Sequence, residues 1–453
     1  MTNDMTKGSP VKLILAFMIP TYLGNIFQQF YNLVDSIVAG RYIGVNALAA
    51  IGSTASLIFL VIGWLNGLTS GFAIMVAQSF GAKDYRKMRH FVAMSILLCL
   101  AFVAVMTAGL LVLNYPILRM MNAPADIIDD TASYMAIIYA GLVVTAAYNA
   151  FAAVLRALGD SKSPLYFLII SAFINVVLDV LFIVVFHMGV EGCAYATVIA
   201  QGISALLCLI YIVRKFEILK LCRDDFRQDF AAIRQLLSMG IPMGLQFSIT
   251  AIGTIIVQGA VNVFGAAAIA GFSAAGKIQN MVASLFVAFG ASIATYVGQN
   301  RGAGRMDRIH QGVRGTQVMI LIWSVVTFVI IHFFGASLTC IFVDSTQTGV
   351  IKAAKQYFAV VAWCYPFLGS IFLYRNALQG LGYGFMPMMG GVFELVARAV
   401  VVALVARMGW GYVGTCAADP AAWVAALIPI VPYYFYKMRE VMQKNAGDSG
   451  LTK

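Results

Sequence analysis

Two carboxylates inside apolar stretches are the side chains of this sequence best suited to chemistry. Asp35 lies near the end of the apolar run 13–39, and Asp179 lies within the apolar run 165–187. An ionisable group inside a membrane-spanning run is rare and costly, so it indicates a functional site. Asn175 precedes Asp179 by one helical turn and therefore shares its helix face.

Asp35, Asp179 and Thr197 are expected to lie at similar depths along their helices. Asp35 precedes Gly40 by five residues and Asp179 precedes His187 by eight, so they lie about 7 and 12 Å from the same end of their helices. Thr197 lies about 9 Å beyond Glu191 on the next run. Four oxygen-bearing side chains suit a hard cation such as Na⁺. The two acids could instead share a proton, or could merely cap helices or face a water-filled vestibule.

Further polar residues extend this region. Gln28 and Tyr31 lie seven and four residues before Asp35, on the same helix face, and Tyr139 and Asn149 lie within the run 132–157. They suit the wall of an amphipathic cavity, and they suit hydrogen bonds between helices equally well. Pro20 removes a backbone hydrogen bond from the first run, which predicts a hinge there.

The elements that carry these residues are membrane-spanning helices. Of the 453 residues, 61% are hydrophobic and 11% are charged, against about 25% charged in soluble domains. At about 20 apolar residues per span, the chain is an all-α integral membrane protein with twelve spans. The expected spans are residues 13–39, 48–75, 91–114, 132–157, 165–187, 191–213, 236–262, 267–297, 315–335, 356–380, 387–406 and 411–436.

The basic residues predict the topology. Lys and Arg gather in the loops after the second, sixth, eighth and twelfth spans, which accounts for the net charge of +11. Because cytoplasmic loops are enriched in these residues, the N-terminus is expected to be cytoplasmic. Compact loops and the lack of eukaryotic sorting features favour a bacterial inner membrane.

The two halves of the chain resemble each other. Three motifs recur in order at offsets of 221 to 223 residues: Ile19-Pro20 with Ile241-Pro242, Gln78-x-x-Gly81-Ala82 with Gln299-x-x-Gly302-Ala303, and Leu155-Arg-Ala-Leu-Gly159 with Leu378-Gln-Gly-Leu-Gly382. Six spans per repeat predict parallel repeats, as in some secondary transporters. The expected domains are an N-terminal lobe (1–213), a cytoplasmic linker (214–235) and a C-terminal lobe (236–453).

Charged residues in the second half follow a different pattern. The positions corresponding to Asp35 and Asp179 are Val257 or Gln258 and Val401 or Val402, which places ion coupling in the N-terminal lobe. Glu394 and Arg398 lie at i and i+4 and are expected to neutralise each other, as a structural pair or in substrate passage. Lys277 is a lone cation for which Glu394 is a possible partner.

Several classes of protein are excluded by what the sequence lacks. It has no GxxxxGK[ST] pattern for ATP, no His or Cys at metal-ligand spacing and no nucleophile–base pair. We therefore expect neither an enzyme nor a cofactor, and no nucleic-acid partner. A passive channel or structural protein remains an alternative, and dependence of transport on an ion gradient separates it from an antiporter.

The motifs together resemble the multidrug and toxic compound extrusion (MATE) family. The resemblance spans about residues 10–437 and is carried by Ile19-Pro20, Val34-Asp35 followed by Gly40-Arg41, Gln78-x-x-Gly81-Ala82 followed by Asp84, Arg156-Ala-Leu-Gly159-Asp160 followed by Pro164, Asn175-x-x-x-Asp179, and Gly189-x-x-Gly192-x-Ala194-x-Ala196-Thr197. It implies two six-helix lobes forming a V-shaped cavity and cation-coupled drug efflux.

The resemblance also implies roles for single residues. The family's cation site in the N-terminal lobe falls on Asp35, Asn175, Asp179 and Thr197, which would be metal ligands if the ion is Na⁺. Its bending helix falls on the first span at Pro20, and its drug contacts fall near Gln28, Tyr31 and Asn149. Acids that one branch of the family carries in spans 7 and 10 are absent here, near Thr250 and near Leu368-Gly369.

These observations predict a monomeric antiporter in the lipid bilayer. It is expected to export small amphipathic, often cationic compounds in exchange for Na⁺ or H⁺, and the sequence leaves the choice of ion open. The alternative is a flippase for lipid-linked or polysaccharide precursors, which would need wide basic surfaces for phosphate.

Overall fold

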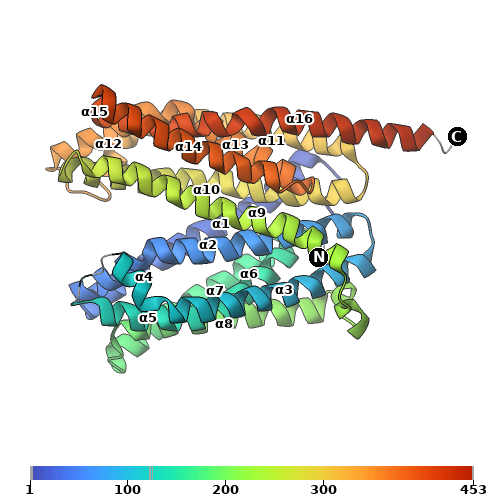
Figure 1. The fold of residues 1–453 in the computed structure, drawn as a ribbon, viewed down its shortest axis with the longest axis horizontal. Coiled ribbons are helices and arrows are strands. Elements are labelled where there is room, and N and C mark those ends of the chain that lie inside the picture. Colours follow the sequence, from blue (N-terminus) through green and yellow to red (C-terminus); the bar gives the residue numbers. More distant parts are fainter. Residues whose placement is uncertain (1–3, 122–123, 125, 451–453) are drawn as a thin grey trace. The chain divides into compact units, whose positions relative to one another are not determined.

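The protein is helical throughout the part that the computed structural model describes, which is residues 4–121, 124 and 126–450 (Figure 1). Side chains of residues 31–33, 35, 36, 39, 45–49 and 444–450 lie outside that description. Among the described residues, eleven helices are long and apolar enough to cross a membrane, and a bent pair over residues 128–157 raises the number to twelve. The prediction of an all-α protein with twelve spans is confirmed.

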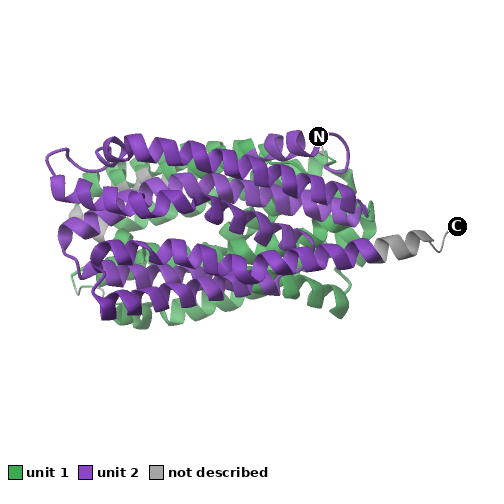
Figure 2. Ribbon diagram, turned by 90° about the horizontal axis from the view of Figure 1, so that it is seen from above, with its two compact units in different colours: residues 1–4, 19–244 green, residues 5–18, 245–453 purple. Residues whose placement is uncertain are grey.

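The chain forms two compact units, coloured separately in Figure 2. Unit 1 holds residues 1–4 and 19–244, and unit 2 holds residues 5–18 and 245–453. Helix α1 (Pro10–Tyr42) begins in unit 2 and continues in unit 1, whereas α9 (Phe230–Asn262) begins in unit 1 and continues in unit 2. Each of these helices contains a proline, Pro20 and Pro242, within two residues of the change of unit.

Unit 1 is built on a bundle of apolar helices. Besides parts of α1 and α9 it contains α2 (Val45–Gly81), α3 (Tyr85–Val112), α4 (Asn114–Met120), α5 (Ile128–Ala140), α6 (Leu142–Ala157), α7 (Lys162–Asp179), the π-helix η1 (Val180–Val185) and α8 (Gly189–Lys215). The span formed by α5 and α6 bends by 45° at Gly141. A side chain at Gly141 would overlap Val198 of α8, so glycine permits this close packing.

The segment between α8 and α9 is folded against unit 1 as two short 3-10 helices, η2 (Glu217–Leu219) and η3 (Arg223–Phe226). Asp225 is 6% exposed and lies 3.3 Å from Arg89 Nε. It also accepts a hydrogen bond from the Cys222 amide, and its carbonyl oxygen lies 2.9 Å from His90 Nδ1. These contacts fix the segment to the start of α3.

Unit 2 has the same kind of bundle. It contains α10 (Ala266–Gly302), α11 (Met306–Thr339), α12 (Thr348–Val361), the 3-10 helix η4 (Ala362–Cys364), α13 (Tyr365–Gly380), α14 (Phe385–Met408), α15 (Gly411–Cys416) and α16 (Ala418–Gly450). Helices α12, η4 and α13 together make one span, and α15 and α16 make another. Helix α10 is the most enclosed, with 72% of its apolar window buried.

The residues just before α1 are held in unit 2 by a buried polar cluster. Gln299 Oε1 accepts a hydrogen bond from the Met5 amide at 2.9 Å. Asn300 Nδ2 and the Arg308 guanidinium donate to the Met5 carbonyl at 3.1 and 3.2 Å. Gln299 and Asn300 are both fully buried. The repeated Gln299 motif therefore anchors the beginning of the chain.

Candidate functional site

The end of α7 combines two buried polar residues with an unusual backbone. Asn175 and Asp179 are both 0% exposed, one turn apart on the same face of the helix. At Asp179 the α-helix gives way to the six-residue π-helix η1. Single π-turns inside helices are rare and occur often at functional sites. Nothing in the apolar sequence Val-Leu-Phe-Ile-Val-Val predicted this change.

The Asn175 side chain calls for a polar ligand. Neither Oδ1 nor Nδ2 of Asn175 has a hydrogen-bond partner among the described residues. Leaving a buried amide unpaired costs about 1–3 kcal/mol, which a purely structural role does not explain. A fully buried carboxylate such as Asp179 is far more costly still, unless a proton, a cation or hydrogen bonds accompany its charge.

Thr197 lies at the level of Asn175 on the neighbouring helix α8. Ser171 Oγ donates to the Ala200 carbonyl at 2.6 Å, and Ser204 Oγ donates to the Phe167 carbonyl at 3.3 Å. These two bonds show that α7 and α8 run antiparallel. Asn175 follows Ser171 by four residues on α7, and Thr197 precedes Ala200 by three residues on α8. Because the helices are antiparallel, both residues lie about one turn from this bond, on the same side of it. Thr197 is half-buried.

Helix α1 packs against α7 in the same unit. A Cβ on Gly24 would lie 3.7 Å from Leu165 and 3.9 Å from Leu168. Three spans separate the two helices along the chain, so they run in the same direction. Asp35 and Asp179 each lie eleven residues beyond this contact, counted from Gly24 and Leu168, which is about 16 Å of helical rise. The Asp35 side chain itself lies outside the described residues.

The other expected site residues are spread over unit 1. Pro20 is buried within α1, Gln28 is exposed on the same helix, and Asn149 is half-buried on α6. Tyr139 is fully buried in the hydrophobic core of unit 1, and its hydroxyl has no hydrogen-bond partner among the described residues. The side chain of Tyr31 lies outside the description.

Unit 2 contains a buried network of ion pairs. Glu394 lies 3.6 Å from Arg375 and 3.4 Å from Arg398, and Arg398 Nε lies 3.1 Å from Asp419. The Tyr357 hydroxyl donates to Asp419 at 3.4 Å and is also bonded to Gln279. Two acids and two arginines leave this network without net charge.

The network both confirms and corrects the sequence analysis. The expected pair of Glu394 and Arg398 is present. Glu394, which the sequence offered as a possible partner of Lys277, contacts Arg375 and Arg398, whereas the Lys277 ammonium lies 5.3 Å from the centre of the Phe342 ring. Arg375 and Asp419 were missed as partners because they come from other helices, which the spacing within one helix does not reveal.

Comparison with known proteins identifies the same family in both halves of the chain. The MatE family model matches residues 20–181 and again residues 242–404, so its two matches begin 222 residues apart, as the internal repeat predicts. Two proteins of Bacillus subtilis are similar. The probable multidrug resistance protein YpnP is 29% identical over 84% of each chain, and the probable multidrug resistance protein YoeA is 27% identical over 96% of this chain and 95% of its own.

Solved structures agree on the fold. A crystal structure of MATE in the bent conformation superposes with a TM-score of 0.91 at 20% identity and covers 98% of both chains. Because the MatE model matches both halves, this chain belongs to the MATE family and is a multi-pass membrane transporter rather than an enzyme.

Proposed function

We propose that this protein is a secondary antiporter that exports amphipathic, often cationic compounds in exchange for Na⁺ or H⁺. The observation that carries the proposal is the fully buried pair Asn175 and Asp179 at the change from α- to π-helix. An apolar bundle of transmembrane helices tolerates such a pair where a cation or proton neutralises it. The named relatives, both probable multidrug resistance proteins, support the substrate class.

The proposed ion site consists of Asp35, Asn175, Asp179 and Thr197. All four residues belong to unit 1, and the helices α1, α7 and α8 that carry them are neighbours. Carboxylate, amide and hydroxyl oxygens would serve as ligands for Na⁺. A proton would need only the carboxylates, so loss of the amide distinguishes the two ions.

Ion binding would act on α1 at Pro20. The first residues of α1 belong to unit 2 and the remainder to unit 1, so α1, like α9, would have to take up any change in the relation of the two units. Pro20 cannot donate a backbone hydrogen bond, which lowers the resistance to bending there. An ion at Asp179 shifts the conformational equilibrium only through its different affinity for the two shapes of α1.

The flippase alternative is less well supported. Lipid-linked phosphates call for exposed basic surfaces, whereas the buried Arg375 and Arg398 in unit 2 are neutralised by Glu394 and Asp419. Gln28, Tyr31 and Asn149 remain the proposed contacts for the exported compound, whereas Tyr139 is enclosed in the core of unit 1 in this structure. We further propose that the protein is a monomer in a bacterial inner membrane with a cytoplasmic N-terminus.

The decisive experiment uses purified protein in proteoliposomes. A Na⁺ gradient at constant pH, and separately a pH gradient without Na⁺, would drive transport of a fluorescent cationic dye. Asp179→Asn should reduce gradient-driven transport at least tenfold with either ion, whereas Asn175→Ala should do so only if the ion is Na⁺. Asp344→Asn, in an exposed loop, is the matched control. Wild-type transport by Asp179→Asn, or dye movement without any gradient, would refute the proposal.

A further inference from the structure

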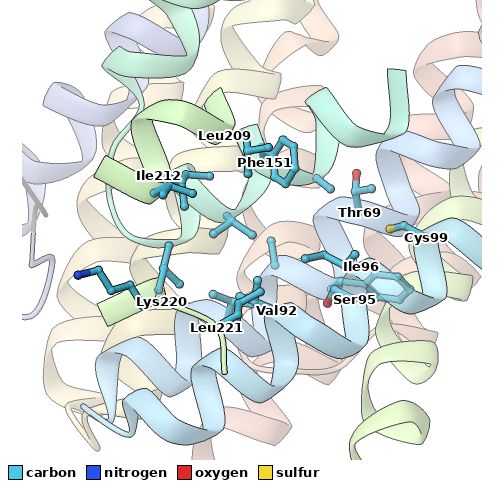
Figure 3. Close-up of a pocket in the computed structure, with 17 residues that line it drawn as sticks. Thr69, Val92, Ser95, Ile96, Cys99, Phe151, Leu209, Ile212, Lys220 and Leu221 are labelled. Atoms are coloured by element: carbon cyan, nitrogen blue, oxygen red, sulfur yellow. The ribbon is translucent and has the colours of Figure 1, made fainter. Parts of the chain in front are cut away.

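Unit 1 contains a second feature, unrelated to the ion site. A pocket of about 500 Å³ lies among α2, α3, α6 and α8, and residues 219–221 of the segment before α9 close one side (Figure 3). Its volume falls within the range of about 300–1,000 Å³ typical of small-molecule sites. No described residue that lines it belongs to the proposed ion site or to the proposed contacts for the exported compound.

The pocket lies within one leaflet of the membrane. Its lining extends from Thr69 to Val76 on α2 and from Val92 to Cys99 on α3, which is about 10 Å along each helix. One leaflet of hydrocarbon is about 15 Å thick. Val76 adjoins the end of the apolar run 48–75, and α2 continues about 8 Å beyond it to Gly81, so the pocket is expected to begin at the edge of the hydrocarbon on the side of the basic loops.

One side of the pocket faces lipid. Leu209 and Val213 of α8 line it and are 40% and 60% exposed, although they are apolar side chains of a transmembrane helix. Apolar residues dominate the remaining walls as well. A hydrocarbon chain can therefore enter sideways from the bilayer without crossing water.

Polar groups follow an order along the pocket. Lys220 lies at one end in Figure 3, with its ammonium group directed away from the apolar side chains, and Thr69 and Cys99 lie at the other end. Ser95 lies between them. Ser95 is 7% exposed, and its hydroxyl has no hydrogen-bond partner among the described residues. Thr69 Oγ1 already donates to the Leu65 carbonyl at 3.0 Å, so the order along the pocket is a positive charge, a free hydroxyl and an end whose hydroxyl is already paired.

The basic residues at the Lys220 end of the pocket favour a negatively charged ligand. Arg214 and Lys215 end α8, and Lys220 follows directly after η2. The Glu217 carboxylate pairs with the Lys220 ammonium at 3.7 Å, and both side chains are largely exposed. A basic cluster beside a gap between transmembrane helices is typical of sites for anionic lipid headgroups. It disfavours the cationic compounds that the transporter is proposed to export.

We propose that this pocket binds an anionic glycerophospholipid from the leaflet on the side of the basic loops. Its phosphate would pair with Lys220, an ester carbonyl would accept a hydrogen bond from Ser95, and one acyl chain would fill the space toward Cys99. A bound lipid would thereby join α3 and α8 to the segment that leads into α9. The proposal does not depend on which ion or compound the protein transports.

The test uses the full-length protein in nanodiscs. The probe is phosphatidylglycerol with a photoactivatable diazirine on one acyl chain, and cross-linked peptides are identified by mass spectrometry. Labelling is expected on residues 92–99 and 209–213. Ala150→Phe, which fills the pocket from α6, should reduce it at least fivefold. Lys220→Gln should reduce it about fivefold, the effect of one interfacial basic residue. Lys162→Gln, an exposed lysine at the start of α7, should leave it unchanged.

Three results would overturn the proposal. Equal labelling by phosphatidylcholine would remove the role of the anionic headgroup. Labelling unaffected by Ala150→Phe would show ordinary lipid at the outer surface of the protein. Displacement of the probe by a transported cationic dye would assign the pocket to substrate. If Ala150→Phe fails to fold, Ala73→Leu on α2 reduces the same space with a smaller side chain.

Discussion

Glu394 is the residue of unit 2 whose neutralisation should have the largest effect on stability. It is the ion-pair partner of Arg375 and also contacts Arg398, whereas Arg398 has Asp419 as a second partner. Glu394→Gln therefore leaves a buried guanidinium at Arg375 without an opposite charge. Arg375→Met with Glu394→Gln removes both charges and leaves the pair of Arg398 and Asp419 intact.

The magnitude follows from the geometry. At the 3.6 Å between Arg375 and Glu394, two unit charges attract by about 4–5 kcal/mol at an effective dielectric constant of about 20. Removing one partner of a buried pair costs about 3–5 kcal/mol, whereas replacing both by apolar or neutral groups is often nearly neutral. Glu394→Gln should therefore lose about 3–5 kcal/mol, and the double variant should regain most of this loss.

Thermal unfolding of purified protein in detergent, followed by intrinsic fluorescence, measures this difference. For a unit of this size 1 kcal/mol corresponds to about 2–4 °C, so Glu394→Gln should lower Tm by about 6 °C or more. Asp307→Asn, which breaks an exposed pair with Arg305, should leave Tm unchanged. If the double variant is as unstable as Glu394→Gln, the loss comes from packing and the electrostatic reasoning is wrong.

Two further predictions concern other parts of the two units. Gly71→Ala should lower Tm because the new Cβ would lie 2.7 Å from Gly240 Cα. Gly109→Ala, whose Cβ would meet open space, should raise the free energy of unfolding by about 0.5–1 kcal/mol. Equal Tm values for the two variants would contradict this packing argument. Arg308→Ala should speed hydrogen exchange in the peptide that contains Met5 because it removes a buried hydrogen bond, and unchanged exchange by mass spectrometry would show that the remaining contacts suffice.

The sequence predicted the architecture because the membrane imposes it. Backbone groups in hydrocarbon must be satisfied within each segment, so long apolar runs are helices and their number can be counted. The repeat was equally accessible, because prolines and glycines mark backbone positions that recur in both halves. Segment ends were harder to predict: α11 begins at Met306 rather than at residue 315, since polar residues extend the helix beyond the apolar run.

Features that depend on contacts between helices could not be predicted in this way. Asp419 lies near the start of α16, and its pairing with Arg398 of α14 depends on how the two helices pack. The anchoring of Met5 joins residues almost 300 positions apart. The π-helix after Asp179 lies in a run of apolar residues that suits an α-helix equally well. In each case the packing of helices against one another determines the structure, and local sequence propensity does not.

The repeat duplicates the proline at which α1 and α9 change unit, but it does not duplicate the acidic residues. This difference supports our proposal that α1 is the helix that responds to the ion. Both α1 and α9 change unit beside a proline, and the segment before each is anchored by buried polar contacts. Helix α9, however, contains no acidic residue. Helix α14, which corresponds to α7, continues unbroken to Met408 and has valines where α7 has Asp179 and a π-turn. In our proposal the duplicated proline supplies flexibility to both helices, whereas Asp35 on α1 and Asp179 on the neighbouring α7 would confer ion dependence on α1 alone.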